Sequence, residues 1–241
     1  MNNIIDMKDH VWKLIAVVAV VAIGGSIVYS NSVSNKANDG IELVDHVKGN
    51  PDAAVTLVEY SDFQCPACAQ FYKIVEEVLA EQGDNIRFEY KHFPLIKPHP
   101  YAVPAAKAAE AAGQQGKFFK MHDKLFENQQ IWSNSANVHS HFNKYAEEIG
   151  LDVGLFKQHM RASVIQDKIT EEMNEGRELG IPGTPSFFLN GKRMEFEMYQ
   201  EFVDQITSAI AAANEEGVKD ETQEGVSAPQ ASAETSVRFG F

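Results

Sequence analysis

A short extended segment runs almost directly into an amphipathic helix, and the chain's only two cysteines lie where the two meet. Residues 54–60 alternate as in a strand, and the mainly apolar face of that strand ends on Glu59. Residues 66–81 then repeat apolar side chains at helical spacing. The pattern therefore predicts a strand followed by a helix whose N-terminus carries Cys65 and Cys68.

The remaining patterns predict an α/β fold. A second strand is expected at residues 86–93, a hairpin with an Asn-Gly turn at residues 186–189 and 192–196, and a closing helix at residues 201–213. Helical patterns fill residues 100–178, far more chain than one crossover between parallel strands needs. The expected order is β-α-β, a helical insertion, then β-β-α.

The N-terminus carries a targeting signal. Residues 14–29 are uncharged and largely apolar, and Lys8 and Lys13 precede them. The run is longer than a signal-peptide core and a little short of the roughly 20 residues that span a bilayer. We therefore predict a transmembrane signal anchor at residues 1–30, with a cleaved signal peptide as the alternative. Either would place the rest of the chain on the extracytoplasmic face of the cell membrane, in a periplasm or outside the cell.

Polar segments flank the predicted domain. We expect a linker and lead-in strand at residues 31–48, one domain at residues 49–213, and a disordered acidic tail at residues 214–241. The chain has 34 acidic against 21 basic residues and a formal charge of -13. This balance argues against a nucleic-acid partner, because phosphate binding needs clustered Lys and Arg.

A Cys-x-x-Cys pair is compatible with a redox dithiol, half of a zinc site, or two small buried residues. Structural zinc takes four ligands, and the chain offers no second cysteine pair. His139 and His141 are too close together for the usual histidine pair. We therefore expect a redox dithiol, with neither a metal nor a cofactor.

The position of the pair assigns a role to each thiol. Cys65 and Cys68 would lie one helical turn apart, within disulfide range. Unpaired N–H groups and the helix dipole favour a thiolate on Cys65, which stabilises the reduced form and makes the disulfide a stronger oxidant. We predict that Cys65 attacks and Cys68 resolves. Pro66 lies early in the helix, where its missing N–H costs little.

Three other positions have candidate roles. Glu59 is either a partly buried carboxylate that relays the proton of Cys68, or a strand-edge residue in water. Lys91, near the end of the adjacent predicted strand, is positioned to pair with it. Thr184-Pro185 precedes a strand and indicates a turn, in which a tight approach would require a cis bond.

Four separated blocks of the chain, within residues 50–212, resemble the DsbA-like family of the thioredoxin superfamily. The blocks are residues 55–68, 91–95, 116–123 and 180–191. The resemblance implies a thioredoxin fold with a helical insertion and Cys65 as the nucleophile. It also implies that Glu59 is the buried acid and Lys91 its partner.

The resemblance further implies a client-binding surface. Pro185 would be a cis-proline facing the dithiol, and Thr184 would contact the dithiol. An extended client would add as a strand to the backbone beside Pro185. We expect Thr184, Phe63 and Pro66 to contact the client.

The expected function is a disulfide-forming oxidase that acts on exported proteins and exchanges electrons with a membrane partner, either a quinone-linked oxidase or an electron donor. The Pro66-Ala67 dipeptide replaces the Pro-His of the archetypal strong oxidant, which predicts a less extreme potential. One alternative is therefore a reductase or isomerase of the same fold. The other is a non-catalytic module that binds clients or copper, for which Met194 and Met198 are candidate ligands.

Overall fold

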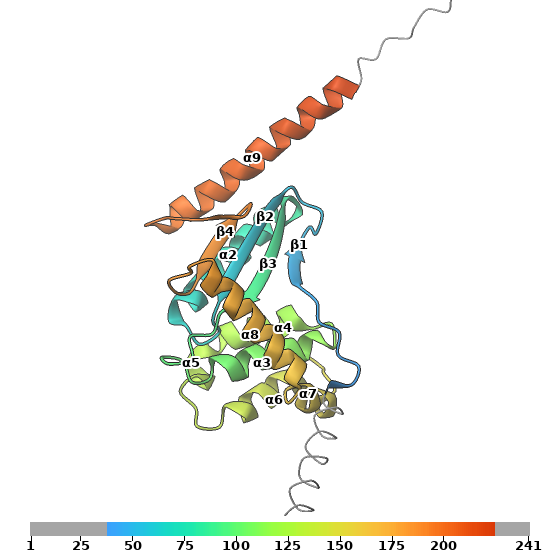
Figure 1. Cartoon of the computed structure of the whole chain (residues 1–241), viewed down its shortest axis with the longest axis vertical. Coiled ribbons are helices and arrows are strands. Elements are labelled where there is room, and N and C mark those ends of the chain that lie inside the picture. The colour runs from blue at the N-terminus through green and yellow to red at the C-terminus, as the bar shows by residue number, and fades with distance from the viewer. Residues whose placement is uncertain (1–37, 225–241) are drawn as a thin grey trace, which may run out of the picture.

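The computed structural model describes the backbone of residues 38–224 and the side chains of residues 38–215 (Figure 1). Its strands are β1 (His46–Gly49), β2 (Val55–Ser61), β3 (Ile86–His92), β4 (Ser186–Leu189) and β5 (Lys192–Arg193). Its helices are α2 (Pro66–Gln82), the 3-10 turn η1 (Gly83–Asn85), α3 (Ala102–Gly113), α4 (Phe118–Glu127), α5 (Gln129–Trp132), α6 (Val138–Glu148), α7 (Val153–His159), α8 (Ser163–Glu178) and α9 (Tyr199–Glu224).

The strands form a single sheet in the order β1-β3-β2-β4-β5. Strands β2 and β3 are parallel, joined by α2, and every other neighbouring pair is antiparallel. Glu59 in the centre of the sheet is flanked by Tyr90 on β3 and Phe187 on β4. The predicted order of β-α-β, helical insertion and β-β-α is confirmed.

Side chains alternate between the two faces of the sheet and enter two different layers. Leu57 belongs to the large core beneath α2 and α9, where Phe71 and Phe202 pack edge to face. Tyr60 points to the other face and packs in a smaller cluster with Met173 of α8. Adjacent residues of β2 therefore meet different chemical surroundings.

The helices of the insertion gather at one end of the sheet, and α8 runs back along one face of it (Figure 1). Helix α3 lies among α4, α6, α7 and α8. Ala106 packs with Ile165 and Ile169 of α8. The completely buried alanines of α3 belong to the main core: Ala105, Ala108, Ala109, Ala111 and Ala112. Such small side chains allow helices to approach closely, so an alanine-rich segment is the centre of this subdomain.

A buried carboxylate joins the insertion to the sheet. Glu110 of α3 is fully buried, and its Oε1 lies 2.9 Å from His46 Nε2, 3.0 Å from His92 Nε2 and 3.0 Å from Lys168 Nζ. Lys168 also pairs with Glu172. Burial raises the pKa of Glu110, but the hydrogen bonds and charge of His46 and His92 outweigh it and hold that pKa well below its usual range. We call these five residues the Glu110 cluster; it was not predicted from the sequence.

The C-terminal helix is longer than predicted. Helix α9 continues to Glu224, so the prediction of a disordered tail is wrong for residues 214–224. That segment contains four Glu, one Lys and one Gln among its eleven residues, and these are good helix formers, so a polar composition did not distinguish tail from helix. Strand β5 is shorter than the predicted segment at residues 192–196.

The predicted signal anchor at residues 1–30 and the end of the tail, residues 225–241, lie outside the described residues. Within residues 38–224, none of the helices combines the length and the apolar character needed to cross a membrane.

Candidate active site

The two cysteines lie at the start of α2, as predicted. Cys65 is the N-cap residue, in an extended conformation with ψ 123°, and the helix begins at Pro66. Both thiols are free, and their exposure differs: Cys65 is 7% exposed and Cys68 is 0% exposed. Pro66 and Ala67 between them are exposed, whereas Cys68 is completely buried beneath them.

A loop far away in sequence completes the site. The Thr184–Pro185 peptide bond is cis, as the resemblance implied, and Cys65 Sγ donates a hydrogen bond to the Thr184 carbonyl oxygen at 3.3 Å. The Thr184 hydroxyl is buried without a hydrogen-bond partner among the described residues while Cys65 is a thiol. Once Cys65 ionises, that hydroxyl is available as a donor to the sulfur.

The two thiols have opposite acidities. Hydrogen bonding from the Cys68 thiol, aided by the Thr184 side chain and the N–H groups of Cys68 and Ala67, outweighs burial and lowers the pKa of Cys65 to about 5. Burial, together with the adjacent Cys65, raises the pKa of Cys68 well above its ordinary value. Cys65 is therefore an ionised thiol at neutral pH, and Cys68 keeps its proton.

Glu59 lies beneath the dithiol. It is 2% exposed, which excludes the alternative of a strand-edge residue in water. Burial raises its pKa to about 7, although the nearby Ser61 hydroxyl opposes this and the negative charge on Cys65 adds to it. Its charge in turn contributes to raising the pKa of Cys68. A carboxyl group with this pKa can both donate and accept a proton near neutrality.

Lys91 does not pair with Glu59. Its Nζ lies 2.8 Å from Glu175 and 3.6 Å from Glu89, on the α8 side of the sheet. The register aligns Lys91 with Tyr60, so its side chain leaves the sheet on the face opposite to Glu59. The predicted ion pair is wrong, and strand alternation is the reason.

Phe63 cannot contact a client. It is 1% exposed and packs against Tyr90 at 5.1 Å and Phe126 at 4.9 Å between ring centroids. The prediction of a client contact at Phe63 is therefore wrong. Its aromatic neighbours show that it belongs to the core that supports the site.

The segment before Cys65 is held by polar residues that the sequence analysis missed. The Asp62 carboxylate accepts hydrogen bonds from Gln64 N at 2.7 Å and Leu95 N at 2.9 Å, and lies 2.7 Å from His99 Nδ1. Buried Gln129 reaches the same segment from the insertion. The Asp62–Gln64 contact is a local turn of a kind that an Asp indicates, whereas the contacts from Leu95, His99 and Gln129 had no sequence signal.

Neither methionine named as a candidate copper ligand supports a metal site. Met194 is buried in the hydrophobic core, and Met198 is exposed on the surface. Residues 38–215 contain no group of three or more His, Cys, Asp or Glu side chains arranged to hold a metal ion.

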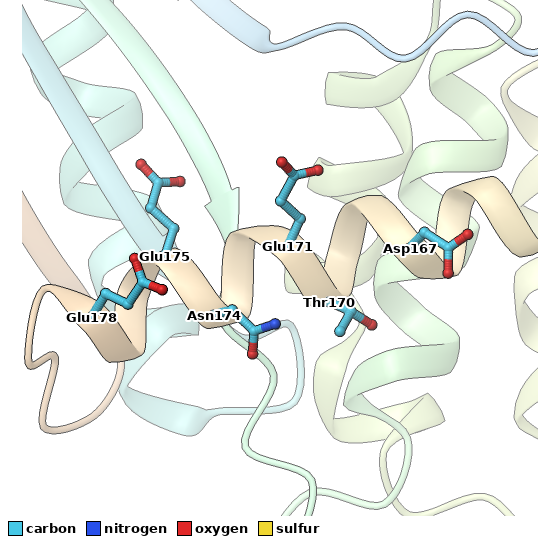
Figure 2. Close-up of a pocket in the computed structure, with 6 residues that line it drawn as sticks. All are labelled: Asp167, Thr170, Glu171, Asn174, Glu175 and Glu178. Atoms are coloured by element: carbon cyan, nitrogen blue, oxygen red, sulfur yellow. The ribbon is translucent and has the colours of Figure 1, made fainter.

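A second surface, strongly acidic, runs along α8. Figure 2 shows its side chains projecting from the helix: Asp167, Thr170, Glu171, Asn174, Glu175 and Glu178. Glu175 is the partner of Lys91, and no thiol or imidazole lies among them. The surface adds to the negative charge of the protein and takes no part in the dithiol site.

The chain belongs to the thioredoxin family, which it matches over residues 42–208. A solved thioredoxin-like oxidoreductase from Silicibacter pomeroyi DSS-3 is 29% identical, with a TM-score of 0.58 over 71% of this chain and 92% of that chain. The alpha-DsbA1 protein of Wolbachia pipientis is 21% identical, with a TM-score of 0.61 over 75% of this chain and 98% of that one. BdbD from Bacillus subtilis is 22% identical, with a TM-score of 0.61 over 69% and 93%. The fold is therefore the DsbA-like form of the thioredoxin fold.

Curated relatives contain the same segment within longer proteins. One named Na(+)/H(+) antiporter NhaA 1, from Mycobacterium sp. (strain KMS), is 39% identical over 153 residues, which are 62% of this chain and 24% of that protein. The protein of the same name from Salinispora arenicola (strain CNS-205) is 42% identical over 149 residues, 22% of its length. The chain spans less than a quarter of the length of these relatives, so their antiporter activity is not transferred to it.

Proposed function

We propose that this chain is a thiol–disulfide oxidoreductase that forms disulfide bonds in exported proteins. The observation that carries the proposal is the asymmetry of the dithiol at the start of α2: an ionised Cys65 beside a buried, protonated Cys68. A stabilised thiolate favours the reduced protein, which makes its disulfide a stronger oxidant.

The reaction begins with the Cys65–Cys68 disulfide. A client thiolate attacks Cys65 Sγ, a mixed disulfide forms, and Cys68 leaves as a thiolate that takes a proton from Glu59. A second client thiolate then attacks the client sulfur of the mixed disulfide and releases Cys65 as a thiolate. The client loses two electrons and two protons; the electrons pass to Cys65 and Cys68, one proton restores Glu59, and the other is released to solvent because Cys65 remains a thiolate.

Client binding is proposed at the cis loop. The Thr184 carbonyl lies beside Cys65 Sγ, so an extended client that pairs with the backbone here would bring its cysteine to that sulfur. The exposed Pro66 and Ala67 would contact the same client from the start of α2. Main-chain pairing of this kind suits many client sequences, because the backbone is common to all of them.

The direction of exchange and the location are also part of the proposal. Reoxidation by a quinone-linked membrane partner would complete the cycle of an oxidase anchored by residues 1–30 on the extracytoplasmic face.

One observation favours the second candidate, a reductase or isomerase. Ala67 offers only its backbone N–H to Cys65, without the side-chain donor of a Pro-His dipeptide.

A trapping experiment tests the exchange itself. The Cys68→Ser variant should accumulate mixed disulfides with client proteins, since the resolving thiol is absent. Cys65→Ser is the matched control and should accumulate none. If both variants are free of adducts, or only Cys65→Ser forms them, the assignment of Cys65 as nucleophile is wrong.

A second experiment tests direction and location. Cells are quenched with acid and the thiols are labelled with an alkylating mass tag; an oxidase should be found mainly as the disulfide. A predominantly dithiol form would favour the reductase. Reduced intact cells are then treated with a membrane-impermeant maleimide, which should label Cys65 only if the domain is exported.

A further inference from the structure

One residue of the helical insertion contacts the backbone of the dithiol segment directly. Gln129, the first residue of α5, is 3% exposed, and its Nε2 donates to the carbonyl oxygens of both Phe63 and Cys65, each at 2.8 Å. Both amide protons are therefore used. Two main-chain carbonyls on either side of Gln64 are held by a single side chain.

Gln129 itself is held in place. Trp132, at the other end of the same helical turn, is fully buried and donates its indole N–H to the Leu125 carbonyl oxygen at 2.7 Å. Phe126 of α4 packs against the Phe63 ring. The amide is thus presented to the dithiol segment from a buried and hydrogen-bonded part of the insertion.

The contact bears on the ionisation of Cys65. The carbonyl that Gln129 holds belongs to the Cys65–Pro66 peptide group and also accepts the Ala69 N–H at 3.2 Å, so Gln129 adds a second hydrogen bond that restrains ψ of Cys65. This angle sets the position of the first helical turn relative to Cys65 Sγ. The N–H groups of Ala67 and Cys68, which lower the pKa of Cys65, lie in that turn.

We infer that Gln129 is a positioning residue for Cys65: the insertion, through this one amide, holds the helix N-terminus in the geometry that stabilises the thiolate. The inference deepens the proposed dithiol exchange, and its consequence for catalysis rests on that proposal. The ionisation of Cys65, however, can be measured without any client, so the two can fail separately.

The test compares two glutamines. Gln129→Met keeps the length and approximate volume of the side chain and removes both donors. Gln115→Met is the matched control, because Gln115 also makes two amide hydrogen bonds within the insertion, to the backbone of Asp152, far from the dithiol in sequence. Thermal unfolding of each variant separates a loss of stability from a change at Cys65.

Thiolate absorbance is titrated for the reduced proteins. Gln129→Met should raise the pKa of Cys65 by about one unit. The equilibrium with glutathione should shift about tenfold toward the protein disulfide, equivalent to about 30 mV in potential. Gln115→Met should leave both unchanged. If Gln129→Met does not fold, Gln129→Asn, which withdraws the amide by one methylene, replaces it. An unchanged Cys65 pKa in the variant that folds overturns the inference, even if its melting temperature falls.

Discussion

Two glutamates are buried in this protein, and their surroundings have opposite effects on them. Glu110 is 0% exposed, and one of its carboxylate oxygens lies within hydrogen-bond distance of His46, His92 and Lys168. Its pKa is therefore far below the usual value. Glu59 is 2% exposed, its Oε1 has no hydrogen-bond partner among the described residues, and its pKa rises to about 7.

The comparison shows that burial alone does not set the charge of a carboxyl group; its partners do. Glu110 is ionised and joins two parts of the fold. Glu59 is near the midpoint of its titration at neutral pH, beneath a thiol that must gain and lose a proton. The first arrangement suits a structural role and the second suits proton transfer.

The largest effect is expected from Glu110→Gln. It removes the carboxylate that pairs with Lys168 and contacts both histidines, and breaking a buried ion pair typically costs about 3–5 kcal/mol. Chemical denaturation at pH 7 measures the loss. Glu148→Gln is the control, since Glu148 also pairs with two lysines but is exposed to solvent, and its removal should change stability little. Equal losses in the two variants would show that the Glu110 cluster is not special.

Glu59→Gln should increase the stability of the protein, whereas Glu110→Gln should decrease it. The folded protein binds a proton at Glu59 between pH 4.5 and about pH 7 that the unfolded chain has released, so stability falls as pH rises through that window. Removing the group should therefore stabilise the reduced protein by about 3 kcal/mol at pH 8 and by almost nothing at pH 4.5. Denaturation curves of the reduced proteins at both pH values measure this. A pH-independent difference would contradict the raised pKa.

The same substitution should slow the chemistry. Without a proton donor and acceptor beside Cys68, the step that forms or breaks the mixed disulfide should be about 100-fold slower. Stopped-flow reduction of the protein disulfide by a dithiol peptide follows it. The decrease should be greatest near pH 7, where Glu59 titrates in the native protein. A stable variant with unaltered rates would leave Glu59 with no role in proton transfer.

Lys91→Met should have the smallest effect. Its partners Glu89 and Glu175 lie on the α8 side of the sheet, and a partly exposed pair of this kind contributes less than about 1 kcal/mol. The pH dependence that Glu59 produces should not change. A shift in that pH dependence would mean that Lys91 does act on Glu59, contrary to the strand register.

Much of the fold was predictable because its signals are local. Alternation identified β2 and β3, helical spacing identified α2, and the Asn190-Gly191 turn marked the hairpin. Pairings between distant segments were harder. The alternation that placed Glu59 on the apolar face should also have placed Lys91, which follows Arg87 and Glu89 on the polar face, away from it.

The residues of the site also separate into those that local patterns predicted and those that depend on contacts between distant segments. The roles of Cys65 and Cys68 follow from the position of a Cys-x-x-Cys pair at a helix start, and burial of Glu59 follows from its strand face. The Glu110 cluster and the contacts of Gln129 depend on how the insertion packs against the sheet. No spacing in the sequence encodes that docking, so neither could be predicted.

The Glu110 cluster has a consequence for how the molecule opens. Its members come from β1, β3, α3 and α8, so the insertion cannot leave the sheet without breaking the contacts of the buried Glu110 with His46 and His92. The two parts should therefore unfold as one cooperative unit rather than as separable foldons. Native-state hydrogen exchange would show amides of α3 and β3 opening with the same free energy. The contacts of Gln129 with the backbone of the dithiol segment would be lost in the same opening.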